Sequence, residues 1–203
     1  MKSEGASSVM KKNLIQFCVL ICVSLLNSSY VVGAEVDAAW VKQQALQVAT
    51  QYANSIACGT LIEEKNLIAL RPWKNQDDDE ERFNAEYALV WHGDVGCAGG
   101  SGSANPQIAI VRITTADFFS VDPLVSSPVI KFDVPVHYLD EIIKYSDKEL
   151  LFKTKIWGND DPHCCPSIPA NMLFRRDAKG NWKHVKTIKI KDIKAETNKQ
   201  SAH

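Results

Sequence analysis

The spacing of apolar residues changes once along the chain, from a helical period near the N-terminus to alternation further on. Over residues 38–57, apolar side chains recur at steps of three and four, which places them on one face of a helix. These side chains are Val41, Ala45, Val48, Tyr52 and Ile56. Asp37 stands at the position of an N-cap, and Cys58-Gly59 at that of a glycine C-cap. The pattern therefore predicts a helix over residues 38–57.

Alternating apolar and polar residues predict β-strands in the rest of the chain. The clearest segments are 85–92 ("AEYALVWH"), 107–114 ("QIAIVRIT"), 128–138, 149–157 and 171–190. Within the last of these, "DAKG" predicts a hairpin turn. Two stretches fit the pattern less well. Residues 60–73 are ambiguous between a short helix and a strand, and residues 139–146 predict one short helical turn.

One helix followed by five or six strands, most of them antiparallel, predicts an α+β domain. In such a domain the N-terminal helix packs on one face of the sheet. We expect this single domain to span residues 35–192 and to be stabilised by disulfides. The polar segment at residues 193–203 predicts a flexible C-terminal tail.

The N-terminal segment has the features of a secretory signal peptide. A basic pair at residues 11–12 precedes an apolar run over residues 14–26. The run is shorter than the roughly 20 residues that a spanning helix needs, and Cys18 and Cys22 within it lack the small neighbours of a lipidated cysteine. We expect cleavage after Ala34 and no stable membrane anchor afterwards. The mature protein is therefore expected to be periplasmic or secreted.

The charge of the chain argues against one class of partner. The sequence has 23 basic and 24 acidic residues, and the predicted signal peptide contains three of the basic residues and one of the acidic ones. Both signs are mixed along the chain, as on an ordinary soluble surface. Because nucleic-acid binding needs a strongly basic face, we expect no nucleic-acid partner.

Four cysteines remain after the predicted cleavage, namely Cys58, Cys97, Cys164 and Cys165. An even number of cysteines in an exported protein is typical of a disulfide framework. A bond between the adjacent Cys164 and Cys165 requires a strained ring and is rare. We therefore expect two disulfides that pair Cys58 and Cys97 with the adjacent cysteines, in either of the two combinations.

Two other uses of these cysteines compete with a structural role. Zinc could be held by Cys58, Cys97, His163 and one of the adjacent cysteines, but no CxxC or HxxxH spacing supports such a site. A thiol-redox centre at Cys164-Cys165 needs an activated thiolate, and the neighbouring histidine and aspartates have opposite effects on that activation. The zinc site and the thiol-redox centre remain alternatives to the disulfide framework. The disulfide framework itself needs no metal, and we predict none.

The second unusual segment is the glycine-rich stretch at residues 92–106, "HGDVGCAGGSGSANP". It is long for a connection between adjacent strands, and long loops of this kind are often functional. The lysine of a P-loop is missing, and Ser101 lacks the final glycine of a GxSxG elbow. An exported hydrolase that uses Ser101 and His163 is therefore an alternative without a motif to support it. No catalytic residue and no cofactor is predicted.

The segment "DPHCCPS", followed by "MLFRRDAKGNWK", resembles a motif of bacterial exported proteins and lipoproteins of the LppP/LprE type. The matching residues are Asp161, Cys164, Cys165, Pro166, Ser167, Phe174, Gly180 and Trp182. The resemblance implies a bacterial envelope protein. It also implies cysteines that pair, with "VGCAGG" at residues 95–100 as the corresponding glycine-cysteine loop. It implies no particular activity.

From these features we expect a non-enzymatic binding protein whose partner is another envelope or exported protein. The expected binding surface combines the glycine-rich loop with the loop at residues 159–167, because the two predicted disulfides would bring these loops side by side. Its residues are His92, Asp94, Gly99, Gly100, Ser101, Asp160, Asp161 and His163.

Overall fold

The computed structural model describes residues 35–100, 103–162 and 165–190. The chain divides into two compact units, Met1–Gly33 and Ala34–His203, and every described residue belongs to the second unit. The predicted signal peptide and the predicted C-terminal tail lie outside the described residues. Within the described part, no helix is both long enough and apolar enough to cross a membrane.

The predicted N-terminal helix is confirmed as α2 (Ala38–Ile56). Its N-cap is Asp37, whose side chain accepts hydrogen bonds from two backbone N–H groups of the first turn, at 2.9 and 3.2 Å. The predicted glycine C-cap is wrong. The chain passes directly into strand β1 (Ala57–Leu61), and Gly59 lies within that strand. The helix ends instead at Ala57, whose backbone is extended, and Cys58 already pairs with Asp94 of a neighbouring strand. The left-handed φ of Gly59, +59°, falls at a register shift within β1 rather than at the helix end.

The first sheet has five strands, and their pairings are antiparallel. Besides β1 they are β2 (Leu67–Arg71), β3 (Glu86–Val95), β4 (Asn105–Ile113) and β5 (Phe119–Val121). The order is β1-β3-β4-β5, and β2 also pairs with β3. A short helix, α3 (Asp79–Asn84), precedes β3. The ambiguous residues 60–73 thus contain a 3-10 turn (Glu64–Asn66) followed by β2.

The second sheet also has five strands, in the order β6-β10-β9-β8-β7. They are β6 (Phe132–Asp133), β7 (Glu141–Tyr145), β8 (Glu149–Ile156), β9 (Ile168–Arg176) and β10 (Trp182–Lys189). Among the described strand pairs, only β6 and β10 run parallel. The predicted "DAKG" turn between β9 and β10 is confirmed: Gly180, at a φ of +87°, donates its backbone N–H to the Asp177 carbonyl at 3.0 Å.

Two predicted elements of this region are wrong. Residues 139–146 contain strand β7 rather than a helical turn, because Ile142 pairs with Phe152 of β8 and packs against the core. The strand predicted over residues 128–138 is reduced to the two residues of β6. Pro128 and Pro135 within that segment account for the difference, since proline cannot donate a hydrogen bond to a strand ladder.

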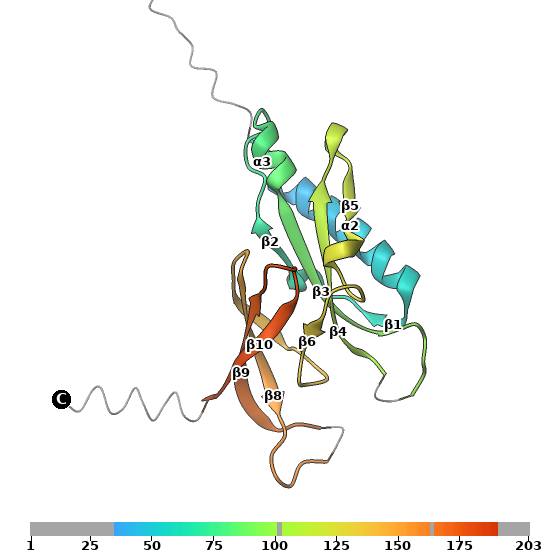
Figure 1. The fold of residues 1–203 in the computed structure, drawn as a ribbon, viewed down its shortest axis with the longest axis vertical. Coiled ribbons are helices and arrows are strands. Elements are labelled where there is room, and N and C mark those ends of the chain that lie inside the picture. Colours follow the sequence, from blue (N-terminus) through green and yellow to red (C-terminus); the bar gives the residue numbers. More distant parts are fainter. Residues whose placement is uncertain (1–34, 101–102, 163–164, 191–203) are drawn as a thin grey trace, which may run out of the picture. The chain divides into compact units, whose positions relative to one another are not determined.

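Two hydrophobic cores separate three layers of structure. One core lies between α2 and the first sheet and includes Tyr87, Leu89 and Trp91 of β3. The other lies between the two sheets and includes Ala88 and Val90 of the same strand. Successive residues of β3 therefore face opposite cores, as expected for a strand covered on both sides. The predicted α+β class, with the helix on one sheet face, is confirmed, and a second sheet covers the opposite face (Figure 1).

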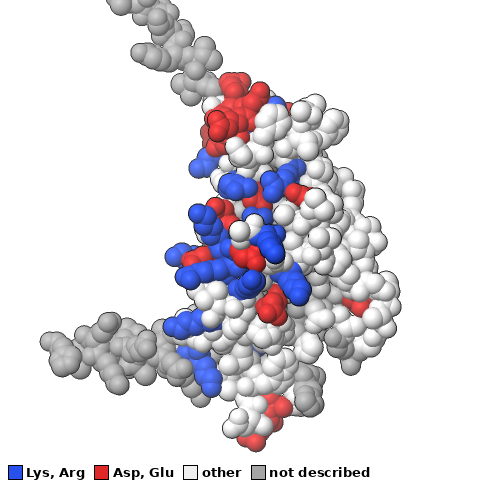
Figure 2. All heavy atoms as spheres, viewed as in Figure 1, with Lys and Arg blue, Asp and Glu red and all other residues white. Residues whose placement is uncertain are grey.

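The surface charge is less evenly spread than the sequence pattern indicates. Figure 2 shows basic side chains gathered over the middle of one face, with acidic side chains among them. Folding therefore concentrates basic groups that are interspersed with acidic ones along the chain.

Candidate functional site

Cys58 and Cys97 form a disulfide with each other, and their Cα atoms lie 5.1 Å apart. The predicted pairing of both residues with Cys164 and Cys165 is therefore wrong. Strand pairing gives the reason: Cys58 on β1 lies opposite Asp94 on β3, which brings it beside the turn that holds Cys97. Cys165 is also disulfide-bonded, and Cys164 lies outside the described residues.

This bond also bears on the zinc alternative. Zinc binds thiolates, and the sulfur atoms of Cys58 and Cys97 are bonded to each other instead. The predicted ligand set of Cys58, Cys97, His163 and one of the adjacent cysteines is therefore contradicted, because it needs Cys58 and Cys97 as thiolates. Within residues 35–100, 103–162 and 165–190, no group of three or more His, Cys, Asp or Glu side chains is placed to hold a metal ion.

Asp94 organises the glycine-rich loop from within. Its carboxylate accepts hydrogen bonds from the backbone N–H groups of Gly99 at 2.7 Å and Ala98 at 3.2 Å. These bonds, led by the one from Gly99, hold the pKa of Asp94 below its usual value. The residue is only 8% exposed, so it stabilises the loop rather than presenting a charge to a partner. Gly99 and Gly100 are exposed, and Ser101 lies outside the described residues.

His92 is also a structural residue. The residue is 6% exposed, and its Nε2 accepts a hydrogen bond from the backbone N–H of Leu139 at 3.2 Å. Burial lowers the pKa of this imidazole, which favours the neutral form that accepts the bond. The ring also lies 5.5 Å from the ring of Tyr138. His92 therefore holds the segment before β7 against the first sheet and does not belong to an exposed surface.

The loop at residues 159–167 has its own organising carboxylate. Asp161 accepts hydrogen bonds from the Gly158 N–H, the Ser167 N–H and the Ser167 hydroxyl, each at 2.7 Å. The Gly158 bond is the largest of the contributions that lower the pKa of Asp161. Asp160 is exposed, and His163 lies outside the described residues. Because Cys97 is bonded to Cys58, the disulfide expected to join this loop to the glycine-rich loop is not formed.

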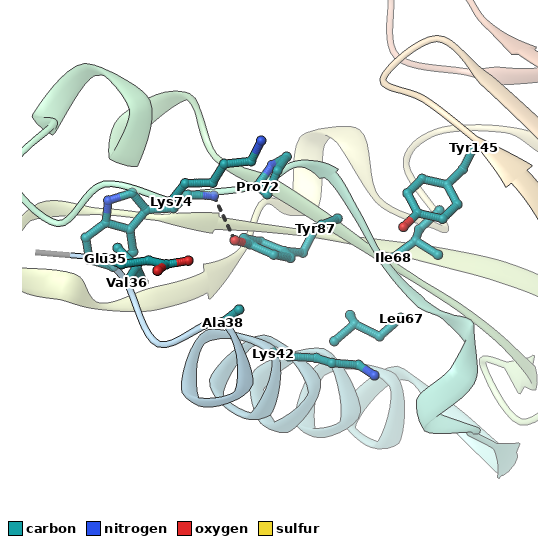
Figure 3. Close-up of a pocket in the computed structure, with 12 residues that line it drawn as sticks. Glu35, Val36, Ala38, Lys42, Leu67, Ile68, Pro72, Lys74, Tyr87 and Tyr145 are labelled. Atoms are coloured by element: carbon teal, nitrogen blue, oxygen red, sulfur yellow. Dashed lines mark hydrogen bonds between the residues drawn. The ribbon is translucent and has the colours of Figure 1, made fainter.

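A better-formed site lies at the edge of the first sheet. A pocket of about 670 Å³ lies between α2, β2 and the end of β7 (Figure 3). Most of its lining is apolar or aromatic, and the residues of this kind are Val36, Ala38, Leu67, Ile68, Ala69, Pro72, Trp73, Tyr87 and Tyr145. Three charged residues complete it, namely Glu35, Lys42 and Lys74. These twelve residues define what we name the β2 pocket.

The β2 pocket follows a strand edge. Leu67 belongs to the core beneath α2, whereas Ile68 belongs to the core between the sheets. A pocket that touches Leu67, Ile68 and Ala69 in succession therefore runs along the backbone of β2 rather than over one of its faces. Among the described residues, β2 pairs only with β3. The backbone N–H and C=O groups on its other edge are thus available to the pocket.

This edge lacks the usual protection against pairing with another chain. Natural edge strands commonly carry charged residues or proline, whereas residues 67–70 read "LIAL". The only charged residue of β2, Arg71, stands at its end, after a register shift that follows Ala69. Glu35 and Val36 already occupy the next part of the edge, where the Val36 N–H donates to the Lys74 carbonyl at 3.0 Å.

The aromatic wall of the pocket is fixed by hydrogen bonds. The backbone N–H of Trp73 donates to the Tyr87 oxygen at 3.0 Å, and the Trp73 indole N–H donates to the Asn75 carbonyl at 2.7 Å. Burial raises the pKa of Tyr87, so its hydroxyl stays protonated. No acceptor for this hydroxyl is found among the described residues, which leaves its O–H able to donate a hydrogen bond into the pocket.

Charged groups stand at the rim. The Lys42 ammonium pairs with Glu64 at 3.3 Å, and both side chains are largely exposed. Glu35 and Lys74 make no ion pair with any described residue and lie at the same end of the pocket. In chemical terms the arrangement offers apolar contact, the hydroxyl groups of Tyr87 and Tyr145, charges of both signs and an open strand edge.

Sequence reasoning missed this site because its residues come from separate segments and form no motif. The signal that could have indicated it is the uncharged run "LIAL" at residues 67–70. Its position at a sheet edge follows only from the tertiary pairing of β2. Tyr145, which closes the far end, belongs to a segment predicted as a helical turn.

No protein-family model matches the chain, and no curated protein or solved structure matches it at a significant level. The resemblance to LppP/LprE-type proteins therefore stays a prediction.

Proposed function

We propose that the chain is an exported, non-enzymatic binding protein that receives an extended segment of another envelope or exported protein in the β2 pocket. One observation carries this proposal: an unpaired, uncharged strand edge runs along an apolar pocket of about 670 Å³. Strand addition to an exposed sheet edge is a recurring mode of peptide recognition. Main-chain hydrogen bonds supply the affinity, and side-chain pockets supply the specificity.

The geometry fits a partner segment with alternating side chains. An extended peptide beside β2 directs every second side chain to the same side, and the side facing α2 offers the apolar space bounded by Leu67, Trp73 and Tyr87. Pockets of 300–1,000 Å³ with mostly apolar walls and a few polar groups are typical ligand sites. Lys74 and Glu35 at one end can contact polar groups of the incoming peptide.

The test uses a panel of nine-residue peptides in which apolar residues alternate with polar ones. Ala38 is exposed and lines the pocket, so an Ala38→Trp substitution fills it without entering the core. The matched control is Ala39→Trp, because Ala39 is also exposed and belongs to the same helical turn but does not line the pocket. We expect Ala38→Trp to lower the affinity for the best-binding peptide by about tenfold or more and Ala39→Trp to leave that affinity unchanged. Equal effects of the two substitutions, or no peptide binding at all, would contradict the proposal.

The hydrolase alternative lacks comparable support. Ser101 and His163 lie outside the described residues, and the Nε2 atom of His92 is occupied by the Leu139 N–H.

A further inference from the structure

A buried carboxylate joins the two sheets on the side of the molecule away from the Cys58–Cys97 turn of β3. Glu86, at the start of β3, has no exposed side-chain surface. Its carboxylate contacts Arg71 at the end of β2, Arg176 at the end of β9 with an N–O distance of 2.7 Å, and Arg112 of β4 at 3.9 Å. Three guanidinium groups thus converge on one carboxylate.

The same three arginines line a second pocket, of about 530 Å³. Lys148, from the turn between β7 and β8, and Lys179, from the turn between β9 and β10, complete its basic lining. We name this site the arginine pocket and define it by these five basic residues. Figure 2 shows the gathering of basic side chains on the viewed face.

The carboxylates around the arginine pocket do not balance its positive charge. Asp122 pairs with Arg112 at 3.0 Å, and Asp177 pairs with Lys183 at 3.0 Å. The remaining negative groups are Glu86 behind the arginines and Asp147 in the lining. With Lys183 included, six basic groups face four carboxylates, which leaves an excess of two positive charges.

The guanidinium groups also keep unused donors. Arg71 uses Nε for the Asn84 carbonyl at 2.8 Å and Nη2 for Glu86. Arg176 uses Nη2 for Glu86. Since each guanidinium has five N–H donors, both residues retain donors beyond these contacts. Lys148 and Lys179 are exposed and make no ion pair with any described residue.

We propose that the arginine pocket binds a phosphate monoester. The planar fork of arginine matches phosphate oxygens with paired hydrogen bonds, and a dianion neutralises the excess of two positive charges. The grouping of cations around a partly shielded pocket raises their mutual repulsion, and a bound phosphate relieves it. The arginine pocket and the β2 pocket share no lining residue. The proposal therefore does not depend on peptide binding in the β2 pocket.

The experiment measures binding of inorganic phosphate to the mature chain by isothermal titration calorimetry. The test variant is Lys148→Ala/Lys179→Ala, which leaves the arginines around Glu86 in place. The control is Lys144→Ala/Lys155→Ala, two exposed lysines outside the arginine pocket. We expect saturable binding that the test variant weakens by about tenfold or more, with the control unchanged. Absence of saturable binding, or equal weakening in both variants, overturns the proposal.

A second arm distinguishes the source of the phosphate. Phosphatidylcholine vesicles that contain phosphatidic acid present the monoester on a membrane surface. Vesicle binding that inorganic phosphate competes away, and that Lys148→Ala/Lys179→Ala loses, supports the arginine pocket with a lipid headgroup as the ligand. Saturable binding of inorganic phosphate without vesicle binding supports the pocket with a soluble phosphate ester as the ligand. Vesicle binding that persists in Lys148→Ala/Lys179→Ala counts against the pocket.

Discussion

Arg176 on β9 donates a hydrogen bond from Nη2 to Glu86 on β3 at 2.7 Å, although the two residues are 90 positions apart in the sequence. The pair connects the second sheet to the first. Glu86 is fully buried, and the arginines around it are its ion-pair partners.

Replacing Arg176 with methionine should lower the free energy of unfolding by about 3 kcal/mol, because it removes a partner from a buried carboxylate. Urea unfolding measures the change. The neighbouring Arg175 provides the control: it pairs with Glu149 at 2.7 Å, but the two side chains are 60% and 40% exposed. Arg175→Met should therefore cost less than about 1 kcal/mol. Similar losses in the two variants would show that burial of Glu86 does not determine the effect.

The Cys58–Cys97 disulfide should stabilise the fold substantially. It joins residues 39 positions apart, and the chain-entropy account gives about 3–4 kcal/mol for a loop of that length. The double variant Cys58→Ser/Cys97→Ser should lose about this much stability in urea unfolding. Non-reducing peptide mapping of the wild-type protein should recover the peptides of Cys58 and Cys97 linked to each other. Recovery of Cys97 linked to Cys165 would contradict the pairing.

His92 should make stability depend on pH near neutrality. Burial places its folded-state pKa below the ordinary value of 6.5, so the unfolded chain binds a proton first as the pH falls. The contribution is fully present above pH 6.5 and is lost on acidification toward the lower folded-state pKa. Unfolding free energies measured between pH 7.5 and pH 5 should therefore decrease.

The matched variant for this effect is His92→Gln, whose amide oxygen can accept the Leu139 N–H without titrating. It should show a smaller decrease in stability over the same pH range. His137→Gln, which leaves His92 in place, should retain the wild-type decrease. An unchanged pH dependence in His92→Gln would rule out His92 as the titrating group.

One substitution, Asp94→Asn, should affect the glycine-rich loop and leave peptide binding in the β2 pocket unchanged. Asp94→Asn weakens the acceptor for the Gly99 and Ala98 N–H groups, so it should speed amide exchange in the loop. It should leave peptide affinity unchanged, since Asp94 does not line the β2 pocket. Paired measurements of exchange and affinity test both statements. A large loss of peptide affinity would indicate that the peptide binds at the glycine-rich loop and not in the β2 pocket.

The sequence predicts most of the elements whose signal is local. The stripe that includes Val41 and Ala45 identifies α2, and Asp37 is its cap. The alternation of Tyr87, Leu89 and Trp91 identifies β3. These predictions succeed because each residue's environment is set by the period of its own element.

The predictions fail where the structure of a segment depends on residues that are distant in the sequence. Ile142 lies in a strand because Phe152 pairs with it, and Cys58 meets Cys97 because β1 pairs with β3. Glu86 lies in an alternating apolar segment, and nothing near it in the sequence indicates Arg176 as its partner. The same limit applies to both pockets, whose linings come from several segments.

The most direct test of the β2 pocket is amide hydrogen exchange with and without the best-binding peptide. The control is β5, an edge strand at the other side of the same sheet. If the peptide adds to the open edge, exchange within Leu67–Arg71 slows by about tenfold or more, and exchange within Phe119–Val121 does not change. Peptide binding that leaves exchange in β2 unchanged, or that slows both strands equally, would contradict recognition by strand addition.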